Sequence, residues 1–87
     1  MFTVTEAAGV RLAEKLATKR ANDDIAMRFV RKRQGWKLRL DKPARGDVVF
    51  AHAGRTVLVL DAQAAQLLLH RTLDTRDTPA GSRLYLR

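Results

Sequence analysis

The chain has no cysteine, and this absence excludes both disulfide bonds and thiolate metal ligands. Small secreted domains often depend on disulfides, so a cysteine-free domain of 87 residues indicates a reducing compartment. Serine is nearly absent as well, with Ser82 its single example, and the five glycines are dispersed. A serine nucleophile motif and a glycine-rich phosphate loop are therefore missing, and nothing in the sequence indicates an enzyme.

Long apolar runs are absent too. The longest uncharged run of mostly apolar residues spans 62–69 and contains Gln63 and Gln66. A membrane helix needs about 20 consecutive apolar residues, and the first residues lack the basic and apolar segments of a secretory signal. We therefore expect a cytoplasmic protein with no membrane partner.

Positive charge is what the chain has in excess. It carries 17 Lys and Arg against 9 Asp and Glu, a net charge of +8, and its sequence pI is about 11.1. Twelve of the 17 basic residues are arginine, whose planar guanidinium forms forked contacts with phosphate or carboxylate. This balance favours a polyanionic partner, either nucleic acid or an acidic protein, although solubility alone would also explain it.

Hydrophobic periodicity predicts a single α+β domain over residues 1–87. The expected helices cover residues 6–20 and 62–69, with Thr5 and Asp61 as N-caps. The expected strands cover residues 2–4, 25–33, 36–41, 48–51, 55–60 and 82–87. Leu73 is expected in a short extended segment, and the polar residues 75–81 are expected to form a loop.

Several short motifs follow one another in a recognisable order. They are Val4-Thr5-Glu6-Ala7-Ala8, Met27-Arg28-Phe29-Val30, Gly46-Asp47-Val48-Val49-Phe50, Gly54, Val57-Leu58-Val59-Leu60-Asp61, and Leu68, Leu73 and Asp74. Their order resembles the HesB/IscA family, the A-type iron–sulfur carriers. The resemblance implies a HesB-like domain: short mixed or antiparallel strands in a compact β-rich sandwich or half-barrel, with an N-terminal helix and one short helix. It also implies that copies of the chain could assemble as dimers or tetramers.

The chain departs from the family at the functional positions. Family members hold iron or a cluster with three cysteines, the first of them in a Gly-Gly-Cys-Ser-Gly loop. Aligning the final glycine of that loop with Gly35 puts Arg33 at the cysteine and Gln34 at the serine. The family's last two cysteines lie in a Cys-Gly-Cys tail, and this sequence ends at Arg87, before the corresponding position. We therefore expect a degenerate member that binds no cofactor.

Basic residues gather around the loop that replaces the cysteine loop. The candidate partner-binding residues are Arg31, Lys32, Arg33, Gln34, Trp36, Lys37 and Arg39. We favour docking on an acidic protein partner, in an accessory or regulatory role within iron–sulfur or sulfur metabolism. The alternative is nucleic-acid binding, with an exposed Trp36 stacked on a base. A third interpretation is a solvated strand end in which Trp36 is buried together with Leu38 and Leu40.

The two histidines are the only candidate nitrogen ligands for a metal. His52 and His70 lie 18 residues apart in the sequence, with no carboxylate or second ligand at a telling spacing. A weak metal site built from histidine and carboxylate remains a third functional hypothesis. The aspartate pairs Asp23–Asp24 and Asp74–Asp77 are explained by turn chemistry rather than by acid–base catalysis.

Overall fold

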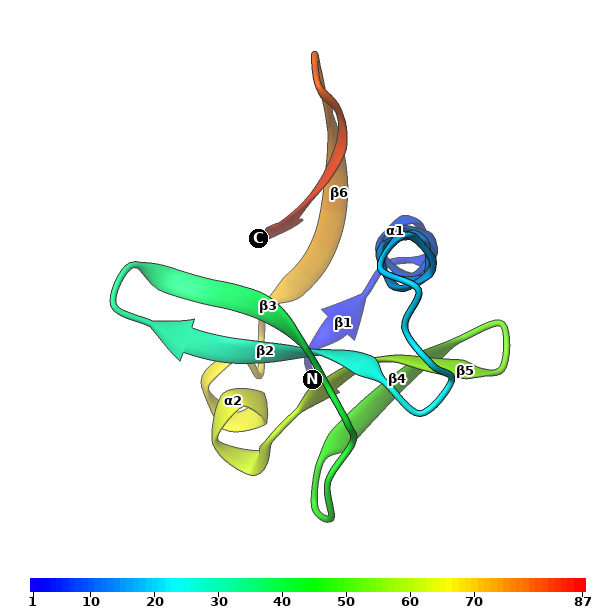
Figure 1. The fold of residues 1–87 in the computed structure, drawn as a ribbon. Coiled ribbons are helices and arrows are strands. Elements are labelled where there is room, and N and C mark those ends of the chain that lie inside the picture. The colour runs from blue at the N-terminus through cyan, green and yellow to red at the C-terminus, as the bar shows by residue number, and fades with distance from the viewer.

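A computed structural model describes all residues, 1–87, as two β-sheets and two helices (Figure 1). The helices are α1 (Glu6–Thr18) and α2 (Ala62–Leu67). The strands are β1 (Thr3–Val4), β2 (Ala26–Lys32), β3 (Gly35–Asp41), β4 (Val48–His52), β5 (Arg55–Leu60), β6 (Thr72–Thr78) and β7 (Gly81–Leu86). The expected α+β class is confirmed, with short strands in mixed sheets and no closed barrel. Neither helix is long and apolar enough to cross a bilayer.

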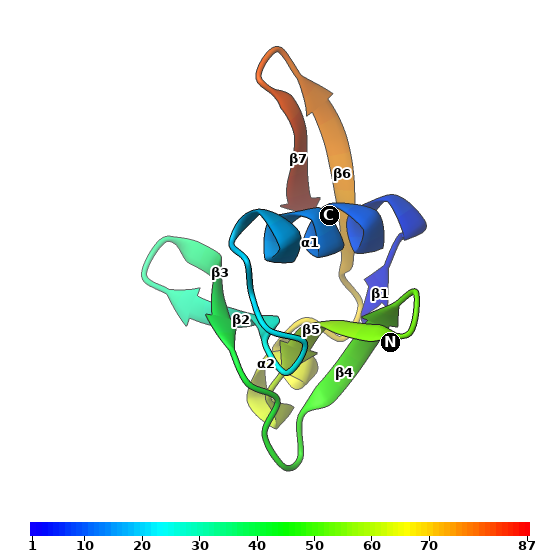
Figure 2. The same ribbon diagram turned by 45° about the vertical axis from the view of Figure 1, so that its right-hand side comes forward.

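The larger sheet has four strands in the order β3-β2-β5-β4. Two antiparallel hairpins, β2–β3 and β4–β5, meet along a parallel pairing of β2 with β5. The smaller sheet has the order β1-β6-β7, in which β1 runs parallel to β6 and β7 runs antiparallel to it. The β6–β7 hairpin projects away from the larger sheet in both views (Figures 1 and 2). The outer edges of β3 and β7 therefore have no strand partner.

Helix α1 packs against strands of both sheets, chiefly β5 and β6. Its apolar face consists of Ala8, Leu12 and Leu16, which are completely buried. Gly9 also lies on this face, and a Cβ atom there would come within 3.1 Å of the His52 Nδ1 atom. The missing side chain lets the helix approach β4, at a cost of about 1 kcal/mol that glycine imposes in a helix interior.

Thr5 links the start of α1 to strand β6, which is distant in the sequence. Its side-chain oxygen accepts a hydrogen bond from the Ala8 N–H at 3.1 Å, as expected for an N-cap. The same hydroxyl donates to the Asp74 Oδ1 atom at 2.9 Å, across 69 residues of sequence. The Thr5 N–H donates to the Leu73 carbonyl at 3.0 Å. The start of α1 is thus fixed to β6.

The core fills the space between α1, α2 and the two sheets. Strand β5 lies at its centre, with Val57 to Leu60 nearly inaccessible to solvent. Phe2 packs edge-on against Phe29 and Phe50, at centroid distances of 6.2 and 5.6 Å. Edge-to-face contacts of this kind are the preferred geometry for aromatic pairs.

The expected loop over residues 75–81 is wrong. Strand β6 continues to Thr78 and pairs with β7 in register from Leu73↔Leu86 to Thr78↔Gly81. Periodicity identifies strands by their buried face, and this projecting hairpin buries little. Its ladder hydrogen bonds and cross-strand contacts hold it instead, including the Arg76 guanidinium 4.6 Å above the Tyr85 ring.

Two further boundaries differ from the sequence prediction. Helix α2 ends at Leu67 rather than Leu69, and both leucines are exposed. Helix α1 ends at Thr18, because Arg20 adopts a left-handed backbone conformation with φ of 54°. Asp61 is confirmed as the N-cap of α2, accepting a hydrogen bond from the Ala64 N–H at 2.7 Å.

Candidate functional site

All seven predicted partner-binding residues lie on one element, the β2–β3 hairpin (Figure 1). We call this set, Arg31, Lys32, Arg33, Gln34, Trp36, Lys37 and Arg39, the basic hairpin. Its turn is formed by Arg33 and Gln34, and Gly35 follows with φ of 114°, a conformation that glycine adopts without strain. Six members are exposed and Trp36 is half-buried. The structure therefore brings the predicted residues together on a projecting hairpin.

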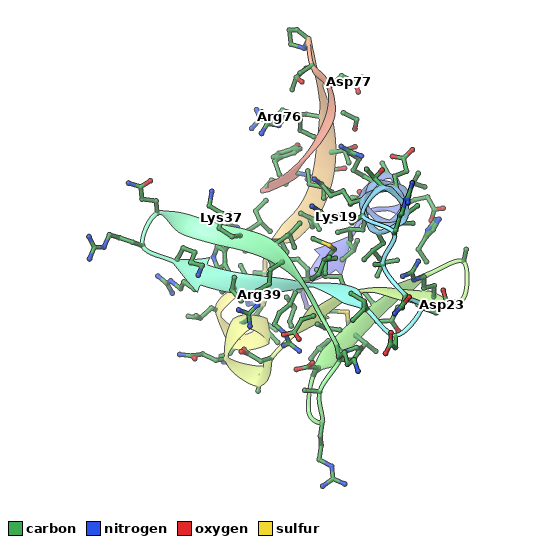
Figure 3. All side chains as sticks on the ribbon, viewed as in Figure 1. Lys19, Asp23, Lys37, Arg39, Arg76 and Asp77 are labelled. Carbon is green, nitrogen blue, oxygen red and sulfur yellow. The ribbon has the colours of Figure 1, made fainter.

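The members of the basic hairpin divide between the two faces of the sheet. Arg31 lies opposite Trp36, and its guanidinium carbon is 5.9 Å from the centre of the indole ring. Lys37 and Arg39 lie along β3 on the other face (Figure 3). Arg39 forms an ion pair with Asp41 at 3.5 Å.

Most of the charge on the basic hairpin has no counter-charge within the chain. The ion pairs of the structure do not involve Arg31, Lys32, Arg33 or Lys37. Four exposed cations are consequently available to an external anion. Exposed, unpaired cations attract oppositely charged partners over about a Debye length, roughly 8 Å at physiological salt.

The sequence left open whether Trp36 is exposed or buried, and the structure shows an intermediate environment. Its ring makes an edge-to-face contact with Phe29, at a centroid distance of 6.1 Å and an interplanar angle of 80°. The side chain is nevertheless only half-buried. Leu38 is also half-buried and Leu40 is 41% exposed, so the predicted burial of this alternating face is incomplete. Trp36 is both a packing residue and part of the accessible surface.

A second arginine on the same strand was not recognised as a site. Arg28 is only 8% exposed, and its guanidinium donates to the Asp47 carboxylate at 2.6 and 3.2 Å. It also donates to Asp41 Oδ2 at 2.9 Å and to the Lys42 carbonyl at 3.1 Å. We call Arg28, Asp41 and Asp47 the Arg28 centre. It holds the loop of residues 42–47 against the sheet.

Hydrogen bonding governs the protonation of the Arg28 centre. The hydrogen bonds from Arg28 lower the pKa of Asp47 below its usual value, although burial opposes this. The pKa of Asp41 is lowered mainly by the hydrogen bond from the Lys42 N–H and then by Arg28. Asp47 in turn raises the pKa of Arg28. All three groups are therefore charged at neutral pH, and they form a structural ion cluster.

A groove lies beside the basic hairpin, and the sequence analysis did not predict it. It has a volume of about 590 Å³ and is bordered by α1, β3 and β7. We call it the basic groove. Its cationic lining residues are Arg11, Lys15, Lys37, Arg71 and Arg83. Its aromatic and aliphatic lining residues are Phe29, Trp36, Leu38, Leu73, Leu84, Tyr85 and Leu86.

The histidines do not meet in a common site. His52 Nδ1 lies 3.9 Å from Glu6 Oε1 and packs against Gly9, whereas His70 is exposed just beyond α2. The structure contains no group of three or more histidine, cysteine, aspartate or glutamate side chains placed to bind a metal ion. The histidine hypothesis therefore gains no support from geometry.

No family model and no curated protein matches the chain, but several solved structures resemble it. One is Escherichia coli SufA, described as involved in the biosynthesis of iron–sulfur clusters; it has a TM-score of 0.77 and 21% identity over 99% of this chain and 83% of that chain. Another is IscA with a 2Fe–2S cluster; it has a TM-score of 0.65 and 21% identity over all of this chain and 84% of that chain.

The chain therefore has the fold of SufA and IscA, and the expected HesB/IscA-like fold is confirmed. The residues present do not suit a cluster as cargo. Thiolates are the usual ligands of iron–sulfur clusters, and the 87 residues contain none. The hairpin turn instead presents Arg33 and Gln34, and a guanidinium is a cation with no free electron pair for iron.

Proposed function

We propose that this chain is a non-catalytic accessory protein that binds no cluster and docks on an acidic protein partner through the basic hairpin. The observation that carries this proposal is the group of unpaired cations at the hairpin turn: Arg31, Lys32, Arg33 and Lys37. They project together from one hairpin, whereas Arg28 on the same strand has its counter-charges within the chain. The fold likeness to SufA and IscA supports a partner in iron–sulfur or sulfur metabolism.

A charge-reversal experiment tests the docking surface. The double variant Arg31→Glu, Arg33→Glu should lose capture of the acidic partner, because the reversed side chains repel its carboxylates. The partner is identified first, by crosslinking in extract of the source organism from a photoreactive residue at position 34. Its binding is then measured with purified components by titration calorimetry.

The control must change net charge equally without touching the hairpin. Arg20 and Arg45 are exposed, take part in no ion pair and lie outside the basic hairpin. The variant Arg20→Glu, Arg45→Glu should therefore keep nearly all of the affinity. Equal affinity of the two double variants would contradict docking through the hairpin.

Nucleic-acid binding is the second candidate function. The half-buried Trp36 next to four unpaired cations is the observation that favours it, because accessible aromatic rings stack on unpaired bases. Binding of labelled single- and double-stranded oligonucleotides is followed by fluorescence anisotropy at two salt concentrations. Phosphate-driven binding should fall by roughly one logarithmic unit per logarithmic unit of salt for each phosphate neutralised. No binding at low salt would exclude this function and leave the protein partner.

A further inference from the structure

The basic groove runs between two sheet edges that lack partners. Strand β3 is one of the two edge strands of the larger sheet, and β7 is one of the two edge strands of the smaller sheet. Both strands contribute lining residues to the groove. Unpaired edges of this kind are templates for an additional strand.

The register tells which backbone groups of β7 face outward. Thr72 and Arg87 exchange two hydrogen bonds, at 2.9 and 2.8 Å, so they form a hydrogen-bonded pair of the antiparallel ladder. Alternate residues then turn their N–H and C=O groups away from β6, and these are Leu86, Leu84 and Ser82. An independent contact agrees, because Arg11 Nε donates to the outward Ser82 carbonyl at 3.1 Å.

The same reasoning applies to β3. The two-residue turn of the hairpin makes Lys32 and Gly35 its closing, hydrogen-bonded pair. The N–H and C=O groups of Trp36 and Leu38 therefore point away from β2. Strands β3 and β7, which both line the groove, thus each have outward-facing backbone donors and acceptors.

The charge of the groove is of one sign. Five of its 14 lining residues are cationic, and none is Asp or Glu. The pKa of Lys15 is lowered, first by burial and then by repulsion from Arg11, Lys19 and Arg83. These groups crowd positive charge at one border of the groove, and a carboxylate placed there would relieve the repulsion.

We propose that the basic groove binds an extended acidic segment of a protein partner, which adds as a strand between β3 and β7. Carboxylate side chains would meet the cations, and alternating apolar side chains would rest on the aromatic and aliphatic lining. About five residues are enough, since this is the common length of a strand. This inference rests on the proposed function, because it gives the form in which an acidic partner is recognised.

Other occupants fit less well. Nucleic acid would use the cations but could not complete the backbone ladders of β3 and β7. A second copy of this chain carries a net charge of +8 and would bring its own cations toward the groove. Only an acidic peptide matches both the backbone groups and the charge.

The probe for the test is a synthetic peptide with capped ends and the repeating sequence Glu-Val. Hydrogen exchange measured by NMR should show new protection at the amides of Trp36, Leu38, Leu84 and Leu86 when the peptide binds. The amides of Lys37 and Tyr85 point into existing ladders and should change little. Binding without this alternating pattern would overturn strand addition.

Two matched comparisons sharpen the result. The variant Arg83→Glu should weaken the peptide by about three- to tenfold, whereas Arg45→Glu should leave it unchanged. A peptide methylated on alternate backbone nitrogens keeps its charge but loses strand donors, and it should bind far more weakly. Equal binding of the methylated peptide, or equal displacement by a short oligothymidylate, would make the groove a general anion site and overturn the proposal.

The two proposals fail separately. If the hairpin variant Arg31→Glu, Arg33→Glu loses the natural partner while the Glu-Val peptide does not bind, docking stands and strand addition is wrong. If the peptide protects the outward amides but the hairpin variant keeps its partner, the groove stands and the hairpin is wrong as the docking surface.

Discussion

Strand β2 carries two kinds of arginine only a few residues apart. Arg28 is 8% exposed and has two carboxylates and a carbonyl around its guanidinium. Arg31 is exposed, and its guanidinium carbon lies 5.9 Å from the centre of the Trp36 ring. The comparison shows that the net charge of a small basic protein does not measure its binding surface. Whether a cation is available for binding depends on whether the chain itself supplies its counter-charge.

The largest expected effect comes from changing the buried Arg28 centre. Replacing Asp47 by alanine should lower the free energy of unfolding by about 3 kcal/mol, because it leaves the Arg28 charge buried with one carboxylate fewer. Asp47 is suitable because its side chain is only 4% exposed. Urea unfolding followed by circular dichroism gives the measurement. Arg33→Ala serves as the control and should stay within about 0.5 kcal/mol of the parent. A loss below about 1 kcal/mol in Asp47→Ala would show that the cluster is dispensable.

The pH dependence of stability should also distinguish the buried Arg28 centre from the exposed basic hairpin. In the folded protein the pKa values of Asp47 and Asp41 are lowered, so both carboxylates contribute stability above their unfolded pKa of about 3.9. This contribution is lost as the pH falls through the lower folded values. The pKa of Asp74 is also lowered, chiefly by the Thr75 N–H and then by Thr5, and it acts in the same direction.

The Asp47→Asn variant should therefore lose less stability than the parent protein between about pH 5 and pH 2. Unfolding midpoints in urea at several pH values provide the test. The Arg33→Ala variant should follow the parent curve. If the curve of Asp47→Asn ran parallel to that of the parent, the ion cluster would not be a source of acid sensitivity.

The smallest expected effect comes from changing the exposed Arg31. Arg31→Ala should cost about 0.5 kcal/mol, since a cation over an accessible indole ring contributes roughly this amount. A double-mutant cycle with Trp36→Leu isolates the contact from other effects of each substitution. A coupling energy indistinguishable from zero would mean that Arg31 does not interact with the ring in solution, and that its guanidinium is fully available to a partner.

The sequence was sufficient where local chemistry decides the structure. The Thr5 and Asp61 caps and the apolar strand of residues 55–60 appear where the residues indicate them. The order of the short motifs was enough to identify the carrier fold, which the likeness to SufA and IscA confirms.

What the sequence could not predict depends on distant partners. Arg28 and Asp47 are 19 residues apart, and only the folded sheet brings their charges together. The outer half of β6 has no apolar pattern, because its stability comes from pairing with β7. The basic groove joins residues from Arg11 to Leu86 and has no local motif at all. The predicted partner-binding residues lie together in the structure because they belong to one hairpin, and a hairpin is a local structure.

The link between Thr5 and Asp74 also bears on how the molecule is made. Strand β1 pairs only with β6, and Thr5 reaches its side-chain partner across 69 residues. Such distant contacts impose the entropy cost of loop closure before they stabilise anything. Strand β1 must therefore wait until Thr72 and Leu73 have been synthesised before it can pair. We expect the domain to fold as one late, cooperative unit rather than progressively from its N-terminus.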